Sequence, residues 1–253
     1  MYLCTLSTRP ARRGLTLIEL VVVLAILAAL AGLIIGNFPG LLQKSTGATS
    51  ANTLQDISRA LSVQFVAKNS YGAGYDSLLD SLGANAFANL PPACTNTTQL
   101  TPAALSAGDA SALKNLGITN VYNLVFVTDA TWTSSDASPS TPVAAGATLA
   151  SAGTNLLAKL LGDRIATLSS PTVYIFGLGK RSTVVGPDGV LLEAPTRTGT
   201  TDLENSQNYY QRYCVAFLVD GASSRNARFL TTLAPTSLGF SVTDDATQMY
   251  SSN

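Results

Sequence analysis

The stretch RGLTLIELVVVLAILAALAGLIIG, residues 13–36, decides the fold of this chain. It places a short basic leader and a glycine directly before a long apolar run. Residues 15–36 number about 22 and would rise roughly 33 Å as an α-helix, whereas the hydrocarbon core of a bilayer is about 30 Å thick. The sequence therefore predicts that the chain begins with a transmembrane helix.

Glu19 is the single charged residue of this apolar run. An ionisable side chain in a membrane helix needs a partner that offsets its desolvation, so it indicates a function. A cut after Gly14 would give Leu15 a free α-amino group, and the same amine on a neighbouring subunit could meet the Glu19 carboxylate. A second interpretation needs no partner, because Glu19 lies near the helix end and its side chain could reach the membrane interface.

The RRG of the leader followed by LTLIELVVVLAIL resembles the class III signal of type IV prepilins and type II secretion pseudopilins. The resemblance implies that a prepilin peptidase cuts after Gly14 and methylates Leu15, and that Glu19 is the acid typical of the fifth mature position. Leu15 departs from the family, which most often has Phe there. The resemblance covers about 25 residues and concerns processing and assembly only.

Two other interpretations of the N-terminus remain open. An ordinary secretory signal could be cut at the small-x-small site Ala29-Leu30-Ala31, although the apolar run continues beyond it. An uncleaved anchor would have the same topology as a prepilin, with the leader arginines on the cytoplasmic side. The three interpretations differ in the N-terminal residue of the mature protein.

The composition suits an exported head domain after the membrane helix. Charged residues make up 12% of the 253 residues. Removing Arg9, Arg12 and Arg13 of the leader from the 15 basic residues leaves 12, against 15 acidic ones. Beyond the leader the largest basic cluster is Lys180-Arg181, which argues against nucleic-acid binding, since this requires several phosphate contacts.

Two of the three cysteines belong to the predicted head. Cys4 lies in the leader, so Cys94 and Cys214 remain as a candidate disulfide in an oxidising compartment. On the chain-entropy model a bridge over a loop of about 120 residues would contribute about 4–5 kcal/mol. Two buried free thiols are the equally supported alternative. The spacing is wider than the short C-terminal bridge of many type IV pilins.

The sequence argues against an enzyme and holds only weak candidates for cofactor sites. Histidine is absent, which excludes imidazole general bases and His-containing zinc sites. Gly177-Leu178-Gly179 fails the spacing of phosphate-binding loops and predicts a hairpin. Some pseudopilins bind calcium in a C-terminal loop, which makes four acids candidate oxygen ligands in an otherwise cofactor-free protein: Asp202, Glu204, Asp244 and Asp245.

After the membrane helix, Pro39 removes a backbone donor and should kink or stop the helix, either as a hinge or as a place that melts during assembly. A second helix is expected over residues 41–69, with Leu54, Ile57, Leu61 and Phe65 forming one apolar stripe that packs on a sheet.

Farther along, the patterns predict helices at residues 75–82, 101–117 and 155–168, with Pro102 at the first position of the second. A surface loop over residues 129–154 begins near Trp132, which we expect to pack on the core. Tyr209, Tyr210 and Tyr213 are likewise expected to serve packing rather than recognition. The strands are expected at residues 121–128, 172–178, 183–185, 190–192, 213–219, 228–233 and 238–242.

Together these features predict an α+β, pilin-like protein in which the long N-terminal helix packs on a C-terminal antiparallel sheet with additional short helices. The predicted parts are a leader at residues 1–14, a transmembrane and assembly helix at 15–38 and an extracytoplasmic head at 39–253. The predicted function is a minor pilin or pseudopilin whose partners are prepilin peptidase, the inner membrane and other subunits. The alternative is a membrane-anchored binding protein that does not assemble.

Overall fold

The structure is a computed structural model. It describes residues 17–80, 87, 90–125, 133–134, 140–197, 199, 201–206, 208–221 and 225–242. The chain divides into two units, Met1–Leu42 and Gln43–Asn253, which are considered separately below. Gly14, Leu15, Trp132, Asp244 and Asp245 lie outside the described residues.

The helix α1, Leu17–Lys68, contains 52 residues and carries the chain from the first unit into the second. The helix does not stop at Pro39, so of the two outcomes expected there, a kink or a stop, the stop is wrong. A proline inside a helix removes one hydrogen bond and crowds the carbonyl four residues earlier, a cost that the turns on either side can offset. The helix ends where predicted, because Asn69 adopts φ = 50° and its N–H bonds to the Phe65 carbonyl at 2.7 Å.

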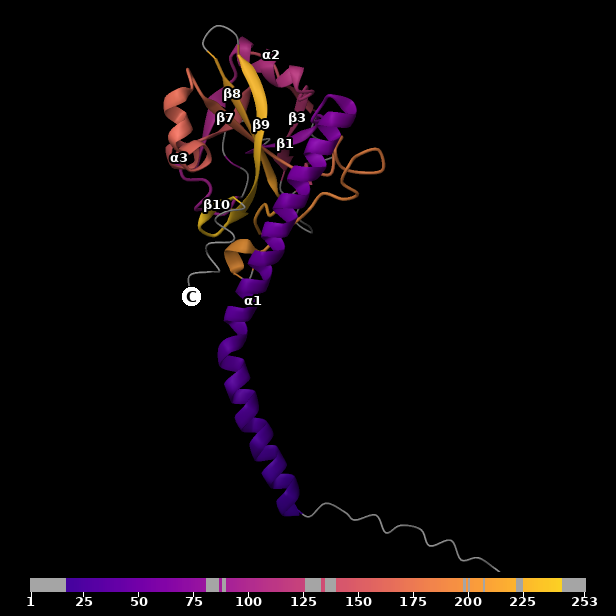
Figure 1. Ribbon diagram of the computed structural model, residues 1–253, viewed down its shortest axis with the longest axis vertical. Coiled ribbons are helices and arrows are strands. Elements are labelled where there is room, and N and C mark those ends of the chain that lie inside the picture. The colour runs from indigo at the N-terminus through magenta and orange to yellow at the C-terminus, as the bar shows by residue number, and fades with distance from the viewer. Residues whose placement is uncertain are drawn as a thin grey trace, which may run out of the picture. The chain divides into compact units, whose positions relative to one another are not determined.

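The second unit is built around a mixed, mostly antiparallel sheet (Figure 1). Within the described residues its main path runs β10-β9-β8-β7-β1-β3-β4, with β1 and β3 parallel. The pairs β2–β6 and β3–β5 lie off this path. The strand bounds are β1 Tyr75–Asp80, β2 Leu100–Ala104, β3 Asn120–Val125, β4 Thr133–Ser134, β5 Ser140–Pro142, β6 Thr148–Ala152, β7 Thr172–Gly177, β8 Cys214–Asp220, β9 Asn226–Thr236 and β10 Gly239–Ser241.

Alternation along the central strands gives the sheet two buried faces. On β8, Val215 and Phe217 face one core and Ala216 and Leu218 the other. The first core also contains Leu54, Ile57 and Leu61 of α1 together with residues of the helix α2, Ala107–Asn115. The second core contains Leu156 and Leu161 of α3, Thr154–Leu161. The sheet is therefore sandwiched between helices, and the predicted packing of the α1 stripe on a sheet is confirmed.

Most of the predicted C-terminal strands are confirmed. β7, β8, β9 and β10 cover residues 172–177, 214–220, 226–236 and 239–241, and β3 covers the described part of residues 121–128. The strands predicted at residues 183–185 and 190–192 are wrong, because Val185 and Leu191 form only an isolated parallel bridge within a compact loop. In this loop the Leu191 N–H donates to the Val184 carbonyl, and Val184 itself is buried in the first core.

Residues 75–82 are predicted as a helix, but residues 75–80 form the strand β1 between β7 and β3. Residues 75–79 are all buried, which is typical of a central strand. Such a strand does not show the alternation of buried and exposed residues by which a strand is predicted from sequence.

The helix predicted from residue 101 is right at its end and wrong at its start. Residues 100–104 form the strand β2, which pairs only with β6, so the missing N–H of Pro102 is tolerated. The N-cap is Ser106, whose Oγ accepts the Asp109 N–H at 3.0 Å, and Gly117 follows the helix with φ = 89°.

Two further segments differ from the prediction. The expected loop over residues 129–154 contains β4 and β5, which pair with the preceding strand β3, and β6, which pairs with β2. The helix expected over residues 155–168 changes at Gly162 (φ = 51°) into the 3-10 helix η1, Gly162–Thr167.

Candidate functional site

The first candidate site is the N-terminal part of α1, which presents an apolar surface around its whole circumference. Glu19 lies in the first turn of the helix and is exposed, as are its neighbours. The exposed large apolar residues range from 49% to 80% exposure and comprise Leu17, Ile18, Leu20, Val21, Val22, Val23, Leu24, Ile26, Leu27 and Leu30. A helix that is apolar on all sides requires burial in a bilayer or among other helices.

Within the described residues, no helix reaches both the length and the apolar character of a membrane span.

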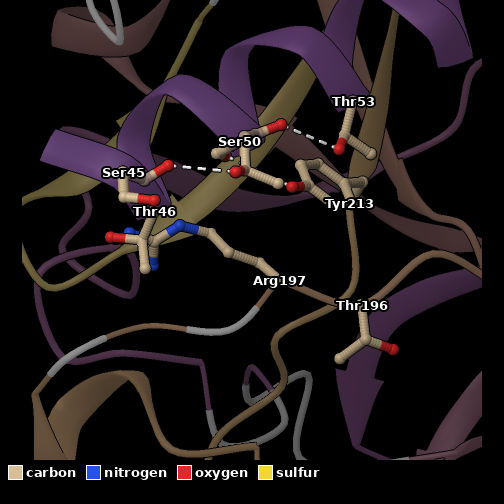
Figure 2. A pocket seen from close by; sticks show the side chains of 8 residues that line it. Ser45, Thr46, Ser50, Thr53, Thr196, Arg197 and Tyr213 are labelled. Carbon is tan, nitrogen blue, oxygen red and sulfur yellow. Dashed lines mark hydrogen bonds between the residues drawn. The ribbon is translucent and has the colours of Figure 1, made fainter. Parts of the chain in front are cut away.

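The second candidate site is a polar groove between α1 and the sheet in the second unit (Figure 2). It has a volume of about 270 Å³. Figure 2 shows side chains of one face of α1 gathered opposite Arg197 and Tyr213. Seven of the eight lining residues carry a hydroxyl, and the lining comprises Ser45, Thr46, Thr49, Ser50, Thr53, Thr196, Arg197 and Tyr213.

The charge of Arg197 is already balanced within the protein. Its guanidinium forms an ion pair with Glu204 at 3.0 Å, and both side chains are more than nine-tenths buried. Glu204 Oε1 also accepts the Ser237 N–H at 3.0 Å and the Ser237 hydroxyl at 3.1 Å. Burial alone would raise the pKa of Glu204, but the Ser237 and Arg197 donors outweigh it, so its pKa lies below the usual 4.5.

The groove is lined by hydroxyl groups and one paired cation. None of its eight lining residues is an acid, a cysteine or a histidine, and Arg197 is bound to Glu204. Thr49 and Thr53 donate their hydroxyl protons to carbonyls one turn back, Ser45 O and Thr49 O. The arrangement offers hydroxyl oxygens and one compensated cation, which suits hydration and polar packing rather than covalent chemistry.

The predicted calcium ligands do not converge among the described residues. Glu204 is engaged by Arg197 and Ser237, whereas Asp202 is exposed on the turn η2, Asp202–Glu204. No group of three or more His, Cys, Asp or Glu side chains suited to a metal occurs in the part of the chain that the structure describes.

Cys94 and Cys214 are buried free thiols in the same core. The Cys94 thiol donates to the Thr236 carbonyl at 3.5 Å, and burial raises its pKa to about 12. Burial also raises the pKa of Cys214, and the nearby Cys94 and Asp76 raise it further. The structure thus brings the two thiols into one neighbourhood, while their pairing stays a prediction.

The motif Gly177-Leu178-Gly179 has a packing role that the sequence does not reveal. A methyl group at Gly177 would overlap the Tyr210 hydroxyl, and one at Gly179 would overlap the Asp76 carboxylate. Tyr210 donates to Asp76 Oδ2 at 2.9 Å, and both residues are fully buried. The two glycines therefore make room for a buried hydrogen bond. Tyr210 and Tyr213 are buried in the second and first cores respectively, in agreement with a packing role.

Sequence reasoning missed a second buried ion pair. Asp109, in the first turn of α2, accepts from Arg225 Nε and from the Tyr174 hydroxyl, the latter at 2.7 Å. Arg225 Nη1 also donates to the Ser170 and Gly221 carbonyls, both at 3.0 Å. Asp109 and Arg225 are 116 positions apart, so no local sequence pattern predicts their contact.

The fold defines the class of the protein: a long N-terminal helix precedes a mixed, mostly antiparallel sheet with short helices, in an α+β pilin-like arrangement. Residues 9–35 match the prokaryotic N-terminal methylation motif, which is typical of type IV prepilins and pseudopilins. The motif implies processing by prepilin peptidase, an N-terminal hydrophobic anchor and an extracytoplasmic head, and pilin-like proteins are generally structural. No curated protein and no solved structure matches the chain.

Proposed function

We propose that this protein is a minor pilin or pseudopilin, a structural subunit of a type IV pilus or a type II secretion filament. Prepilin peptidase cuts the chain after Gly14 and methylates Leu15, and the leader at residues 1–14 stays in the cytoplasm. Residues 15–38 hold the subunit in the bacterial inner membrane before assembly, and the head at residues 39–253 lies outside the cytoplasm.

One observation carries this proposal: a single acid, Glu19, sits in the first turn of α1, and the residues that follow it within the methylation motif, up to residue 32, are exposed and apolar. Burying such a helix among copies of itself removes the apolar surface from water at about 25 cal/mol per Å². An unpaired carboxylate would oppose that burial. The methylated amine of a neighbouring Leu15 is a cation of the right size, and pairing it with Glu19 sets the axial register of the helices.

The low dielectric inside a helical bundle makes this pair strong, and removing one partner leaves the other buried and uncompensated. The head then needs no catalytic group. Its task is to cover the fibre or to present a surface, for which a sandwich of helices and sheet is sufficient.

The first experiment is mass spectrometry of the N-terminus, on protein from its native host with and without prepilin peptidase. We expect the mature chain to begin at methylated Leu15 and the precursor to accumulate without the peptidase. An intact leader would favour the membrane-anchored binding protein that does not assemble, and a chain beginning at Gly32 would indicate an ordinary secretory signal.

Assembly is tested with Glu19→Gln, which keeps the shape of the side chain and removes its charge. We expect normal membrane insertion and processing, but incorporation into sheared filaments reduced at least tenfold. Asp56→Asn is the matched control on the same helix, since Asp56 is exposed and pairs only with exposed Arg59 at 3.7 Å. Normal incorporation of the Glu19 variant would refute the register role.

A further inference from the structure

The part of α1 that first enters the second unit differs in composition from the part that follows. Residues 45–53 read STGATSANT, a run of small, β-branched and hydroxyl-bearing residues with two alanines. Gly, Ser, Thr and Asn are poorer helix formers than Ala, each by up to about 1 kcal/mol. This segment, called the polar joint here, therefore contributes little to its own helicity.

The polar joint is also poorly packed on the head. It forms one wall of the groove of about 270 Å³, and its buried residues are the small ones, Gly47, Ser50 and Ala51. From residue 54 onward the packing changes. Leu54, Ile57 and Leu61 are at most 1% exposed and lie in the first core.

The hydrogen bonds follow the same division. In the polar joint, Tyr213 donates to Ser50 Oγ at 3.3 Å, whereas Thr49 and Thr53 bond back to their own helix. Such back-bonding slightly destabilises a helix. In the following turns, Thr232 donates to the Leu54 carbonyl at 2.8 Å and Lys68 donates to the Asp188 carbonyl at 2.8 Å.

We propose that the polar joint is a separate cooperative unit that opens while residues 54–68 of α1 stay docked on the sheet. A segment with few buried apolar contacts and a groove at its side opens at a low free-energy cost, whereas the docked part opens only with the whole head. Opening frees residues 45–53 of α1 without disturbing either core. The local opening is independent of the proposed function, and only its use in passing from the bilayer into a fibre rests on that function.

The test is native-state hydrogen exchange of the full chain in detergent micelles, followed by peptide mass spectrometry. We expect amides of residues 49–53 to exchange at least a hundredfold faster than those of residues 57–65. Tyr213→Phe removes the bond to Ser50 and should speed exchange in the polar joint only. Equal protection along the whole of residues 49–65 would overturn the proposal.

A paired set of variants separates local opening from general loosening. Thr49→Ala with Thr53→Ala raises helix propensity in the polar joint and should slow its exchange about fivefold, with residues 57–65 unchanged. Ser62→Ala is the matched control, because Ser62 is exposed and also bonds back one turn, to Ser58 O at 2.8 Å. If Ser62→Ala slows the polar joint as much as the threonine pair does, the segment is not a separate unit and the proposal fails.

Discussion

At the scale of single residues, the Glu204 carboxylate connects the segment that holds Arg197 with the turn at Ser237. It pairs with Arg197 beside the groove and accepts from the turn at Ser237. Glu204→Gln would leave the buried guanidinium of Arg197 uncompensated, for which losses of about 3–5 kcal/mol are typical. We expect that loss in the free energy of unfolding by urea. Asp202→Asn, an exposed acid of the same turn, should change it by less than about 0.5 kcal/mol.

The same carboxylate gives the head a defined acid sensitivity. The pKa of Glu204 is lower in the folded than in the unfolded chain, so the folded state binds this proton more weakly. Its contribution to stability is complete above the unfolded value of 4.5 and is lost as the pH falls through the folded pKa. The difference in stability between wild type and Glu204→Gln should therefore shrink below pH 4.5. A difference that stays constant there would contradict this assignment.

The residues that the sequence reveals are those whose role depends on their near neighbours. The sequence marks Glu19 as a candidate because it interrupts an apolar run, and Gly14 and Leu15 because they follow a basic leader; their proposed roles rest on this pattern. The ion pair of Asp109 is not recognisable, because Arg225 lies 116 residues away on another element. Arg197 lies close to Glu204 in the sequence, but the Ser237 donor of Glu204 is 33 residues away, and the spacing of Arg197 and Glu204 follows no regular period. A buried ion pair leaves no periodic trace in the sequence around either partner.

At the scale of elements, the buried face of α1 in the head coincides with the apolar stripe predicted from the sequence. Ile57 is 1% exposed in the first core, whereas Val66 is 86% exposed on the same helix. Ile57→Ala should lower the free energy of unfolding by about 2–5 kcal/mol, since it removes buried methyl groups and leaves a cavity. Val66→Ala replaces another β-branched residue and should change stability by less than about 0.5 kcal/mol. Urea titrations of the full chain in detergent measure both, and similar losses for the two variants would contradict the packing of α1.

Elements that pair locally or show a clear period could be predicted, and elements defined by distant pairing could not. β7, β8 and β9 are β-branched, aromatic runs with turn residues between them. β1 is a short, fully buried segment, YDSLLD, which has neither strand alternation nor enough length to exclude a helix. Its pairing with β3 and β7 fixes it as a strand, and that pairing spans about 45 to 100 residues of sequence.

At the scale of the whole molecule, the sequence pattern of a long helix followed by strands was enough to predict α+β architecture. It was not enough to predict the parallel pairing of β1 with β3, which inserts an early strand into the middle of a late sheet. The order of the strands depends on which pairing best fills both cores. Because that choice is made by many long-range contacts together, no single sequence pattern predicts it.

Burial in the second core should also protect the two cysteine thiols from alkylating reagents. Cys94 and Cys214 are buried, and burial raises the pKa of both thiols, which disfavours the reactive thiolate at pH 8. If both are reduced, an alkylating reagent should label neither in the native protein and both after unfolding in urea. A bridged pair would require a reductant as well as urea. Rapid labelling of the native protein would contradict the second core as described.

The buried contact of Tyr210 with Asp76 restricts how this gene can change. At positions 177 and 179 even a single added methyl group collides with that pair, although neither glycine takes part in any chemistry. Close variants of the chain should therefore keep both glycines for as long as they keep the tyrosine and the aspartate. Where Tyr210 or Asp76 is replaced, the glycine beside it is no longer required. Substitutions at these four positions should therefore occur together among related sequences.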